Sequence, residues 1–186
     1  GHQEDKSKTL NGGWCAYVAR DGFMWLVSQE FGLFKIDINN TIIPHVDMDA
    51  VSSFKEQGDS IGWYGTITGL VLKDFRTGAT RKFVHDPANP KSISDSRVTR
   101  IIKDKAGDFW IGTENGLNHF NVETETFTRY YHNPGSNEDN RVYALYEDSD
   151  STLWVGSLGQ GLDLLNWKTG RYTNYKNDPA DMGTIS

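Results

Sequence analysis

The stretch that decides the fold is Asp104-Lys-Ala-Gly-Asp-Phe-Trp-Ile-Gly-Thr-Glu-Asn-Gly-Leu-Asn-His-Phe120. It holds two short runs of apolar and β-branched residues, each bounded by turn residues, which is the pattern of a β-hairpin. We expect strands over 109–113 and 117–122, with turns at 104–107 and 114–116. In the first turn, the Asp104 side chain is expected to accept backbone N–H groups and fix the hairpin, not to catalyse or bind metal.

The same pattern recurs along the chain. Each of four tryptophans stands six or seven residues before a Gly-Leu pair, at intervals of 38, 47 and 44 residues: Trp25, Trp63, Trp110 and Trp154. A valine stands twelve residues before each of the last three: Val51, Val98 and Val142. A repeat of this length that reads as four short strands indicates a blade of a β-propeller, whereas a β-sandwich predicts no fixed period. The repeated tryptophans are therefore expected to pack between blades rather than to stack on a sugar.

Composition supports this class and excludes others. Among 186 residues there are 19 glycines, 6 tryptophans and only 5 prolines, and 37% are hydrophobic, which suits short strands joined by tight turns around a core. The net charge is −6 and no run of Lys and Arg occurs, so nucleic acid is not an expected partner. No apolar stretch approaches the 18 residues that suggest a membrane helix. The single cysteine, Cys15, excludes an internal disulfide and a cysteine-rich metal site.

The third and fourth repeats carry a recognisable motif. The stretch quoted above, followed by Thr124-Glu-Thr-Phe-Thr-Arg-Tyr130, closely resembles the two-component regulator propeller repeat, and Leu153-Trp-Val-Gly156 continues the resemblance in the fourth repeat. The linking segment Asp86-Pro-Ala-Asn-Pro-Lys-Ser-Ile-Ser94 is also similar to that family. The first two repeats depart from the motif, since Trp25-Leu-Val-Ser28 lacks the glycine and Gly62 replaces the aliphatic residue before Trp63.

The resemblance implies both a location and a role. Members of this family form the periplasmic sensor region of hybrid two-component systems of the Bacteroidetes type, and a membrane segment, a histidine kinase and a response regulator follow the propeller. Their ligands are commonly glycan fragments. By this resemblance the chain is a periplasmic, carbohydrate-responsive sensor module, and it is expected to meet the membrane only through segments absent from this chain.

The predicted fold is all-β: a propeller of four blades, each of four antiparallel strands, forming a fragment or half of a larger propeller. Residues 1–7 are assigned to a tag remnant and an N-terminal tail, because Gly1-His2 is typical of a cloning scar. The repeats are expected at about 8–48, 49–94, 95–138 and 139–186. A cut array leaves its terminal faces uncovered, so one hypothesis is a homodimer in which two copies close an eight-bladed ring.

Five residues are candidates for ligand binding. Arg97 and Arg141 stand directly before Val98 and Val142, where an inner strand would begin at the mouth of the central channel, and guanidinium groups suit carboxylate, sulfate or vicinal hydroxyl groups. Solvated surface arginines are the alternative. Trp14 can stack on a sugar or pack in the core. His85 and His132 occupy corresponding links between blades and can contact a ligand, but no third residue completes a metal site with them.

No catalytic motif, cofactor motif or metal site is found in the sequence. The leading expectation is a non-enzymatic, extracytoplasmic sensor that binds an oligosaccharide. A structural module that only dimerises or displays a protein surface is the second hypothesis, and a glycan hydrolase or lyase is the third. Saturable oligosaccharide binding separates the first from the second, and product formation identifies the third.

Overall fold

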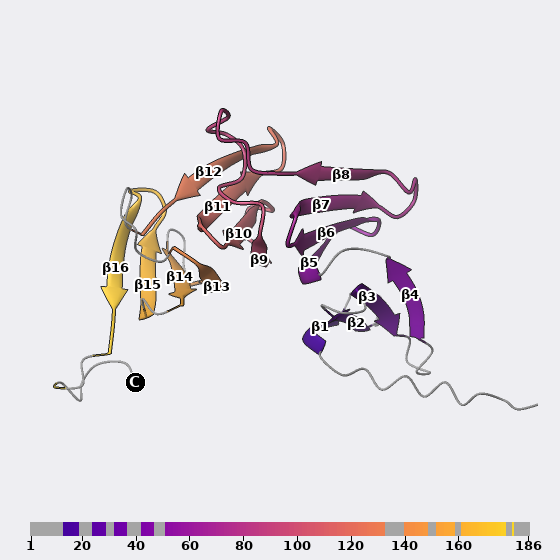
Figure 1. The fold of residues 1–186 in the computed structure, drawn as a ribbon, viewed down its shortest axis with the longest axis horizontal. Coiled ribbons are helices and arrows are strands. Elements are labelled where there is room, and N and C mark those ends of the chain that lie inside the picture. The colour runs from indigo at the N-terminus through magenta and orange to yellow at the C-terminus, as the bar shows by residue number, and fades with distance from the viewer. Residues whose placement is uncertain are drawn as a thin grey trace, which may run out of the picture. The chain divides into compact units, whose positions relative to one another are not determined.

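The chain consists of strands and turns throughout the residues that the structure, a computed structural model, describes: 13–18, 24–28, 32–36, 42–46, 51–132, 140–148, 152–158, 161–177 and 180. These residues form sixteen strands in four antiparallel sheets of four strands each (Figure 1). The chain divides into two compact units, Gly1–Val51 and Ser52–Ser186. No helix long and apolar enough to cross a membrane occurs among the described residues.

The first unit contains one sheet. Its strands are β1 (Gly13–Val18), β2 (Met24–Ser28), β3 (Gly32–Ile36) and β4 (Ile42–Val46), paired in chain order. Between Gly13 and Cys15 the pairing of β1 with β2 shifts by one residue, so Trp14 is the extra residue of a β-bulge.

The second unit contains three sheets of the same order. The second sheet has β5 (Val51–Gln57), β6 (Ile61–Thr66), β7 (Gly69–Asp74) and β8 (Thr80–Phe83). The third has β9 (Val98–Lys103), β10 (Phe109–Thr113), β11 (Gly116–Asn121) and β12 (Thr126–Tyr130). The fourth has β13 (Val142–Glu147), β14 (Thr152–Ser157), β15 (Gly161–Asn166) and β16 (Arg171–Tyr175). This up-and-down arrangement confirms the predicted blade.

One of the two strands predicted from the motif begins one residue earlier than expected. β11 starts at Gly116 and not at Leu117, because Gly116 pairs with Thr113 across the hairpin. Gly116 has a φ of 106°, and a Cβ there would lie 2.9 Å from the ring of Tyr131. Glycine is therefore required both by the backbone conformation and by the space. The predicted repeat boundaries remain predictions, and those at 48/49 and 138/139 lie outside the described residues.

Neighbouring sheets of the second unit pack face to face. Successive residues of β10 point to opposite faces: Phe109 and Ile111 join the apolar cluster shared with the second sheet, whereas Trp110 joins the cluster shared with the fourth. We name the two faces of each sheet by their repeated residues. The tryptophan face carries Trp63, Trp110 or Trp154, and the valine face carries Val98 on the third sheet and Val142 on the fourth.

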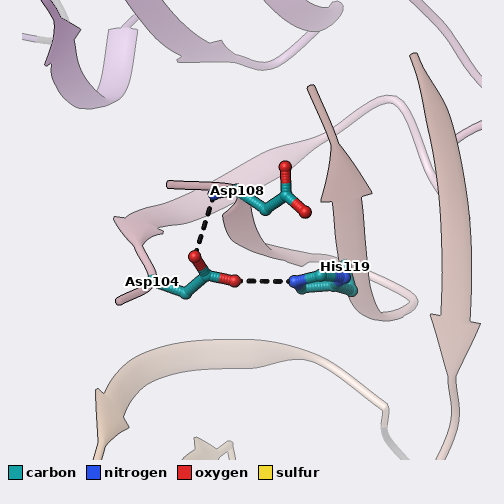
Figure 2. Close-up of side chains that lie close together, drawn as sticks. All are labelled: Asp104, Asp108 and His119. Carbon is teal, nitrogen blue, oxygen red and sulfur yellow. Dashed lines mark hydrogen bonds and ion pairs between the residues drawn. The ribbon is translucent and has the colours of Figure 1, made fainter. Parts of the chain in front are cut away.

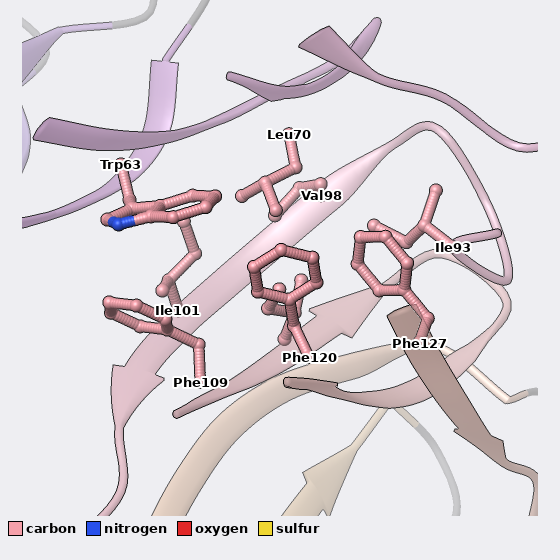
Figure 3. Packing of buried hydrophobic residues seen from close by; sticks show 9 residues of the cluster. Trp63, Leu70, Ile93, Val98, Ile101, Phe109, Phe120 and Phe127 are labelled. Carbon is pink, nitrogen blue, oxygen red and sulfur yellow. The ribbon is translucent and has the colours of Figure 1, made fainter. Parts of the chain in front are cut away.

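The tryptophan face of one sheet is covered by the valine face of the next. Trp63 is 2% exposed and its ring lies 5.1 Å from that of Phe109, centroid to centroid. Figure 3 shows Trp63 and Leu70 of the second sheet against residues of the third: Val98, Ile101, Phe109 and Phe120. Trp110, 1% exposed, packs in the same way with Val142, Leu145 and Val155 of the fourth sheet. Buried aromatic rings of this size dominate core energetics, so these two clusters join the three sheets.

The glycine two positions after each of these two tryptophans lies within a strand, and its role is in packing and not in a turn. A Cβ at Gly65 would lie 2.6 Å from Cγ1 of Val98, and a Cβ at Gly112 would lie 2.7 Å from Cγ1 of Val142. The valine of the next sheet thus sits directly on the bare backbone of the glycine. No larger residue fits there without displacing the valine.

Hydroxyl groups also bridge adjacent sheets. Ser52 Oγ donates to the carbonyl oxygen of Val98 at 2.5 Å, and Thr99 Oγ1 donates in the same way to the carbonyl oxygen of Val142. Ser53 Oγ accepts the N–H of Ile101 at 3.0 Å. These bonds satisfy backbone groups at the edges of the first strands, which have no partner strand beyond them in their own sheet.

Candidate functional site

Arg97 and Arg141 are equivalent in three dimensions as well as in sequence. The carbonyl oxygen of Arg97 accepts the N–H of Glu114 at 3.0 Å, and that of Arg141 accepts the N–H of Leu158 at 3.3 Å. Each arginine therefore lies beside the turn that joins the second and third strands of its own sheet. The entry to the first strand and this turn meet at one end of each blade, which brings loops distant in sequence together.

At this end of the third and fourth sheets lies a small polar group around an exposed aromatic ring. Tyr143, 46% exposed, donates its hydroxyl to Glu114 Oε1 at 3.1 Å. Desolvation and the Glu114 carboxylate raise the pKa of Tyr143, while the positive charge of Arg141 opposes that shift. An aromatic ring, a carboxylate and a guanidinium from two blades thus converge. We call Glu114, Arg141 and Tyr143 the rim cluster.

A β-bulge creates the position of Tyr143. The pairing of β13 with β14 shifts between Val142 and Ala144, so Tyr143 is the extra residue on the first strand. Thr99 occupies the same position in the third sheet and Trp14 in the first. Thr99 is engaged with the neighbouring sheet, whereas the side chain of Trp14 lies outside the described part of the chain. Trp14 and Tyr143 therefore share a register position, and the role predicted for Trp14 stays a prediction.

Arg97 stands at the corresponding end of the third sheet. Its side chain is exposed and its backbone N–H donates to Asp95 Oδ1 at 2.7 Å. The alternatives that the sequence leaves open, a ligand contact and a solvated arginine, are both compatible with this exposure. Of the five predicted residues, Arg141 is the one that the structure joins to the rim cluster.

The two predicted histidines each hold a link between blades. His85 Nδ1 lies 2.9 Å from the carbonyl oxygen of Ile93 within the same link. The backbone N–H of His85 donates to Ser96 Oγ at 3.0 Å. His132 Nδ1 lies 2.9 Å from Oδ2 of Asp163, a fully buried carboxylate on β15. The contacts of His85 lie within its own link, whereas His132 joins its link to strand β15, so each histidine has a structural neighbour and ligand binding is not tested.

Asp163 takes the place that Asn118 has in the third sheet. Asn118 is equally buried, accepts the N–H of Ser94 at 2.8 Å and donates to Ser94 Oγ at 2.8 Å. Asp163 instead contacts His132 and accepts a hydrogen bond from Asn174 Nδ2 at 2.6 Å. The third strand therefore anchors the preceding link in both blades, through an amide in one and a carboxylate in the other.

A cavity of about 10 Å³ lies beside this carboxylate, between the third and fourth sheets. Its lining includes His132, Asp163 and Tyr172. Burial raises the pKa of Tyr172, and the negative charge of Asp163 adds to that effect. A volume of this size has room for at most a single water molecule. The cavity is therefore too small for a sugar ring, and the exposed rim cluster is the better candidate for ligand binding.

One group of side chains among the described residues has the composition of a metal site: Asp104, Asp108 and His119 (Figure 2). Asp104 Oδ1 accepts the N–H groups of Gly107 at 2.7 Å and Asp108 at 2.9 Å, and Asp104 Oδ2 lies 2.8 Å from His119 Nε2. The oxygens of Asp108 accept from Asn121 Nδ2 and from the N–H of Val122, each at 2.9 Å. Every carboxylate oxygen already has a partner, which confirms the predicted turn-capping role of Asp104.

Sequence reasoning missed Glu114 and Tyr143 as members of the candidate site. One feature of the sequence could have indicated Tyr143. The residue eleven positions before each repeated tryptophan is aromatic in the first and fourth repeats, Trp14 and Tyr143, but has a small hydroxyl side chain in the second and third, Ser52 and Thr99. Ser52 and Thr99 bond to the next sheet, whereas Tyr143 is exposed at the rim. Trp167, which lies outside the register of the repeated tryptophans, packs with its ring 6.1 Å from that of Trp110.

Comparison with known proteins identifies both the repeat and the fold. The model of the two-component regulator propeller family matches residues 92–115 and 138–159. No curated protein matches the chain significantly.

Among solved structures, the chain is similar to the extracellular domain of a protein from B. thetaiotaomicron described as a hybrid two-component system, BT3049, with a TM-score of 0.77 and 18% identity over 90% of this chain. The corresponding domain of BT4673 has a TM-score of 0.71, also at 18% identity and over 90% of this chain. Virginiamycin B lyase from Staphylococcus aureus has a TM-score of 0.65 at 16% identity, and the match covers 90% of this chain and 56% of the lyase.

The chain spans 25% of the BT3049 domain and 22% of the BT4673 domain. Identities this low show the fold alone, and that fold is the propeller predicted from the repeats. The chain thus corresponds to about a quarter of the length of these extracellular domains. Two segments of the chain therefore match the two-component regulator propeller repeat, and its four-stranded sheets have the arrangement of β-propeller blades.

Proposed function

We propose that this chain is part of the extracytoplasmic, ligand-sensing region of a two-component sensor, and that its ligand is a carbohydrate. The repeats and the likeness to extracellular domains of two-component systems support the sensor role and the location. The observation that carries the choice of ligand is the rim cluster. An exposed tyrosine ring offers an apolar face to the C–H face of a sugar, while Glu114 accepts and Arg141 donates hydrogen bonds to hydroxyl groups.

Signalling in this proposal needs no reaction in the chain itself. The rim cluster joins residues of two blades, so a ligand bound there contacts both at once. Such a ligand stabilises the arrangement of blades that it binds more tightly, and it shifts the population of the sensor only by that difference in affinity. The kinase that reads the shift lies in other parts of the proposed sensor.

Calorimetric titration of the whole extracytoplasmic region of the gene product against plant and host oligosaccharides tests the proposal. We expect at least one saturable ligand, whose affinity falls about tenfold in Tyr143→Ala, corresponding to roughly 1.4 kcal/mol. Tyr146→Ala is the matched control, because Tyr146 is an exposed tyrosine on the same strand but away from the rim. Absence of binding across the panel would favour a structural interaction module instead.

The same titrations separate sensing from catalysis. Virginiamycin B lyase shares the fold, so the fold alone does not decide this question. Chromatography of the oligosaccharides after incubation should show them unchanged. A product formed from any of them would contradict the proposal and support the third hypothesis, a hydrolase or lyase.

A further inference from the structure

The interface between the third and fourth sheets differs from the preceding one at the place of a single side chain. Between the second and third sheets, Ile93 is fully buried in the apolar cluster. The same cluster contains Leu70, Val98, Ile111 and Phe127. The residues at the equivalent register positions line the cavity between the third and fourth sheets: Leu117, Val142, Val155 and Tyr172. The cavity therefore corresponds to the place that Ile93 fills in the preceding interface.

The sequence of the next link offers no counterpart of Ile93. In the preceding link, the isoleucine stands between two serines, Ser92 and Ser94. Residues 133–139 read Asn-Pro-Gly-Ser-Asn-Glu-Asp, without an aliphatic or aromatic side chain other than the proline ring. The space between the third and fourth sheets therefore has no isoleucine to fill it.

The residues around this cavity are also more polar than their equivalents in the preceding interface. By register, three of them replace a less polar or uncharged residue: Tyr130 for Phe83, Asp163 for Asn118 and Tyr172 for Phe127. All three line the cavity. An apolar plug with apolar neighbours in one interface thus becomes a small space with hydrogen-bonding neighbours in the next.

Two buried polar atoms beside the cavity have no hydrogen-bond partner among the described residues: His132 Nδ1 and Asp163 Oδ2. The two atoms lie 2.9 Å apart, but not in the alignment that a hydrogen bond needs. The Asp163 side chain is only 1% exposed and that of His132 14%. Leaving such buried atoms unpaired is costly, and in proteins ordered water commonly supplies the missing bonds.

We infer that the cavity is the binding site of one buried water molecule, which takes the place of Ile93 and bonds to His132 and Asp163. The volume of about 10 Å³ is at the lower limit for one water molecule. The hydroxyl-bearing residues Ser157 and Tyr172 also line the site and can supply further bonds. The water joins the link at His132 to β15. The two sheets that carry the rim cluster thus meet across bound water, where the preceding pair meets across isoleucine.

Oxygen-17 magnetic relaxation dispersion of the full chain tests this inference, because it counts water molecules held long enough to tumble with the protein. The variant is Val155→Ile. Ile111 occupies the same register position in the third sheet, and the added methylene fills space that Val155 lines. We expect the dispersion amplitude to fall by the contribution of one long-lived water. Val122→Ile is the matched control, since Val122 packs against the other apolar cluster, and its amplitude should equal that of the native chain.

Nuclear Overhauser effects between water and methyl groups give the second readout and locate the site. In the native chain, the methyl groups of Val142 and Val155 should show contacts to water with the sign of a long-lived complex. These contacts should persist in Tyr172→Phe, which removes a hydroxyl proton that exchanges with solvent and can relay the signal. A dispersion amplitude unchanged in Val155→Ile, or methyl contacts that are lost in Tyr172→Phe, would overturn the inference in favour of a dry cavity.

Discussion

At the scale of single residues, the repeat motif separates into positions that turn the chain and positions that hold the blades together. Gly116 is needed for its positive φ and for the ring of Tyr131 above it. Gly112 is needed because Val142 of the next sheet rests on its backbone. The two glycines stand four residues apart in one motif and serve different ends, which spacing alone does not reveal.

The packing role of Gly112 predicts an asymmetry between equivalent glycines. Gly112→Ala should destabilise the chain by about 1–3 kcal/mol, because the new Cβ would lie 2.7 Å from Val142 Cγ1 in a packed interface. Gly156→Ala should cost clearly less, since the atoms nearest to its new Cβ belong to Ala144 of the same sheet, the closest at 3.0 Å, and not to a neighbouring sheet. Urea unfolding followed by circular dichroism measures both free energies, and equal losses would contradict the packing assigned to Gly112.

Buried tyrosines predict how stability responds to alkali. Burial raises the pKa of Tyr64 and of Tyr172, with a further contribution from the negative charges of Glu56 and Asp163 respectively. A raised pKa means that the folded state holds these protons above the unfolded pKa of about 10. The stabilisation is therefore complete below that pH and is lost as pH rises beyond it.

Absorbance at 295 nm and urea unfolding between neutral and alkaline pH check this prediction together. Most tyrosines should ionise gradually, and the last ones should ionise only when the chain unfolds. The stability of Tyr172→Phe should fall less steeply with rising pH than that of the native chain, since the substitution removes one of the coupled protons. A slope that is unchanged in Tyr172→Phe would show that this tyrosine titrates freely in the folded state.

At the scale of elements, the four-stranded unit is organised by its turns. The turn between β9 and β10 is fixed by Asp104, whose Oδ1 accepts two backbone N–H groups while Oδ2 contacts His119. A carboxylate that accepts several such bonds stabilises the turn directly. The corresponding turn of the second sheet has the exposed Asp59 instead.

This difference between the two turns predicts different costs of substitution. Asp104→Ala should destabilise the chain by about 1–3 kcal/mol, because two N–H groups and an imidazole lose their acceptor. Asp59→Ala, the matched control, should stay within about 0.5 kcal/mol, as exposed substitutions usually do. Thermal or urea unfolding of the two variants decides the matter. Similar losses at both positions would show that Asp104 adds nothing beyond an ordinary turn residue.

The strands were predictable because their signals are local. Apolar and β-branched runs between Gly, Asn and Asp turns predicted β10 to the residue, and the prediction for β11 was displaced by one residue at its hairpin turn. The rim cluster was only partly predictable. Arg141 was predicted from its repeat position. Glu114 and Tyr143 were not, because they lie on different blades, 29 residues apart in sequence, and a β-bulge that no local sequence pattern predicts brings them together.

At the scale of the whole molecule, one rule joins the three sheets of the second unit. The tryptophan faces of the second and third sheets meet the valine faces of the third and fourth, and glycine opposite valine sets how closely the two sheets approach. The rim cluster depends on that same contact, because Glu114 belongs to one blade and Tyr143 to the next. Blade packing and the proposed ligand site are therefore coupled through one interface.

The exposure of individual tryptophans tests this packing rule most directly. In the chain labelled with 5-fluorotryptophan, ¹⁹F resonances can be assigned by single Trp→Phe variants, and solvent contact can be measured by the H₂O-to-D₂O shift. The packing predicts that Trp63 and Trp110 are shielded and that Trp154 is in contact with solvent. A solvent shift for Trp154 as small as those of Trp63 and Trp110, or large shifts at all three, would contradict this packing.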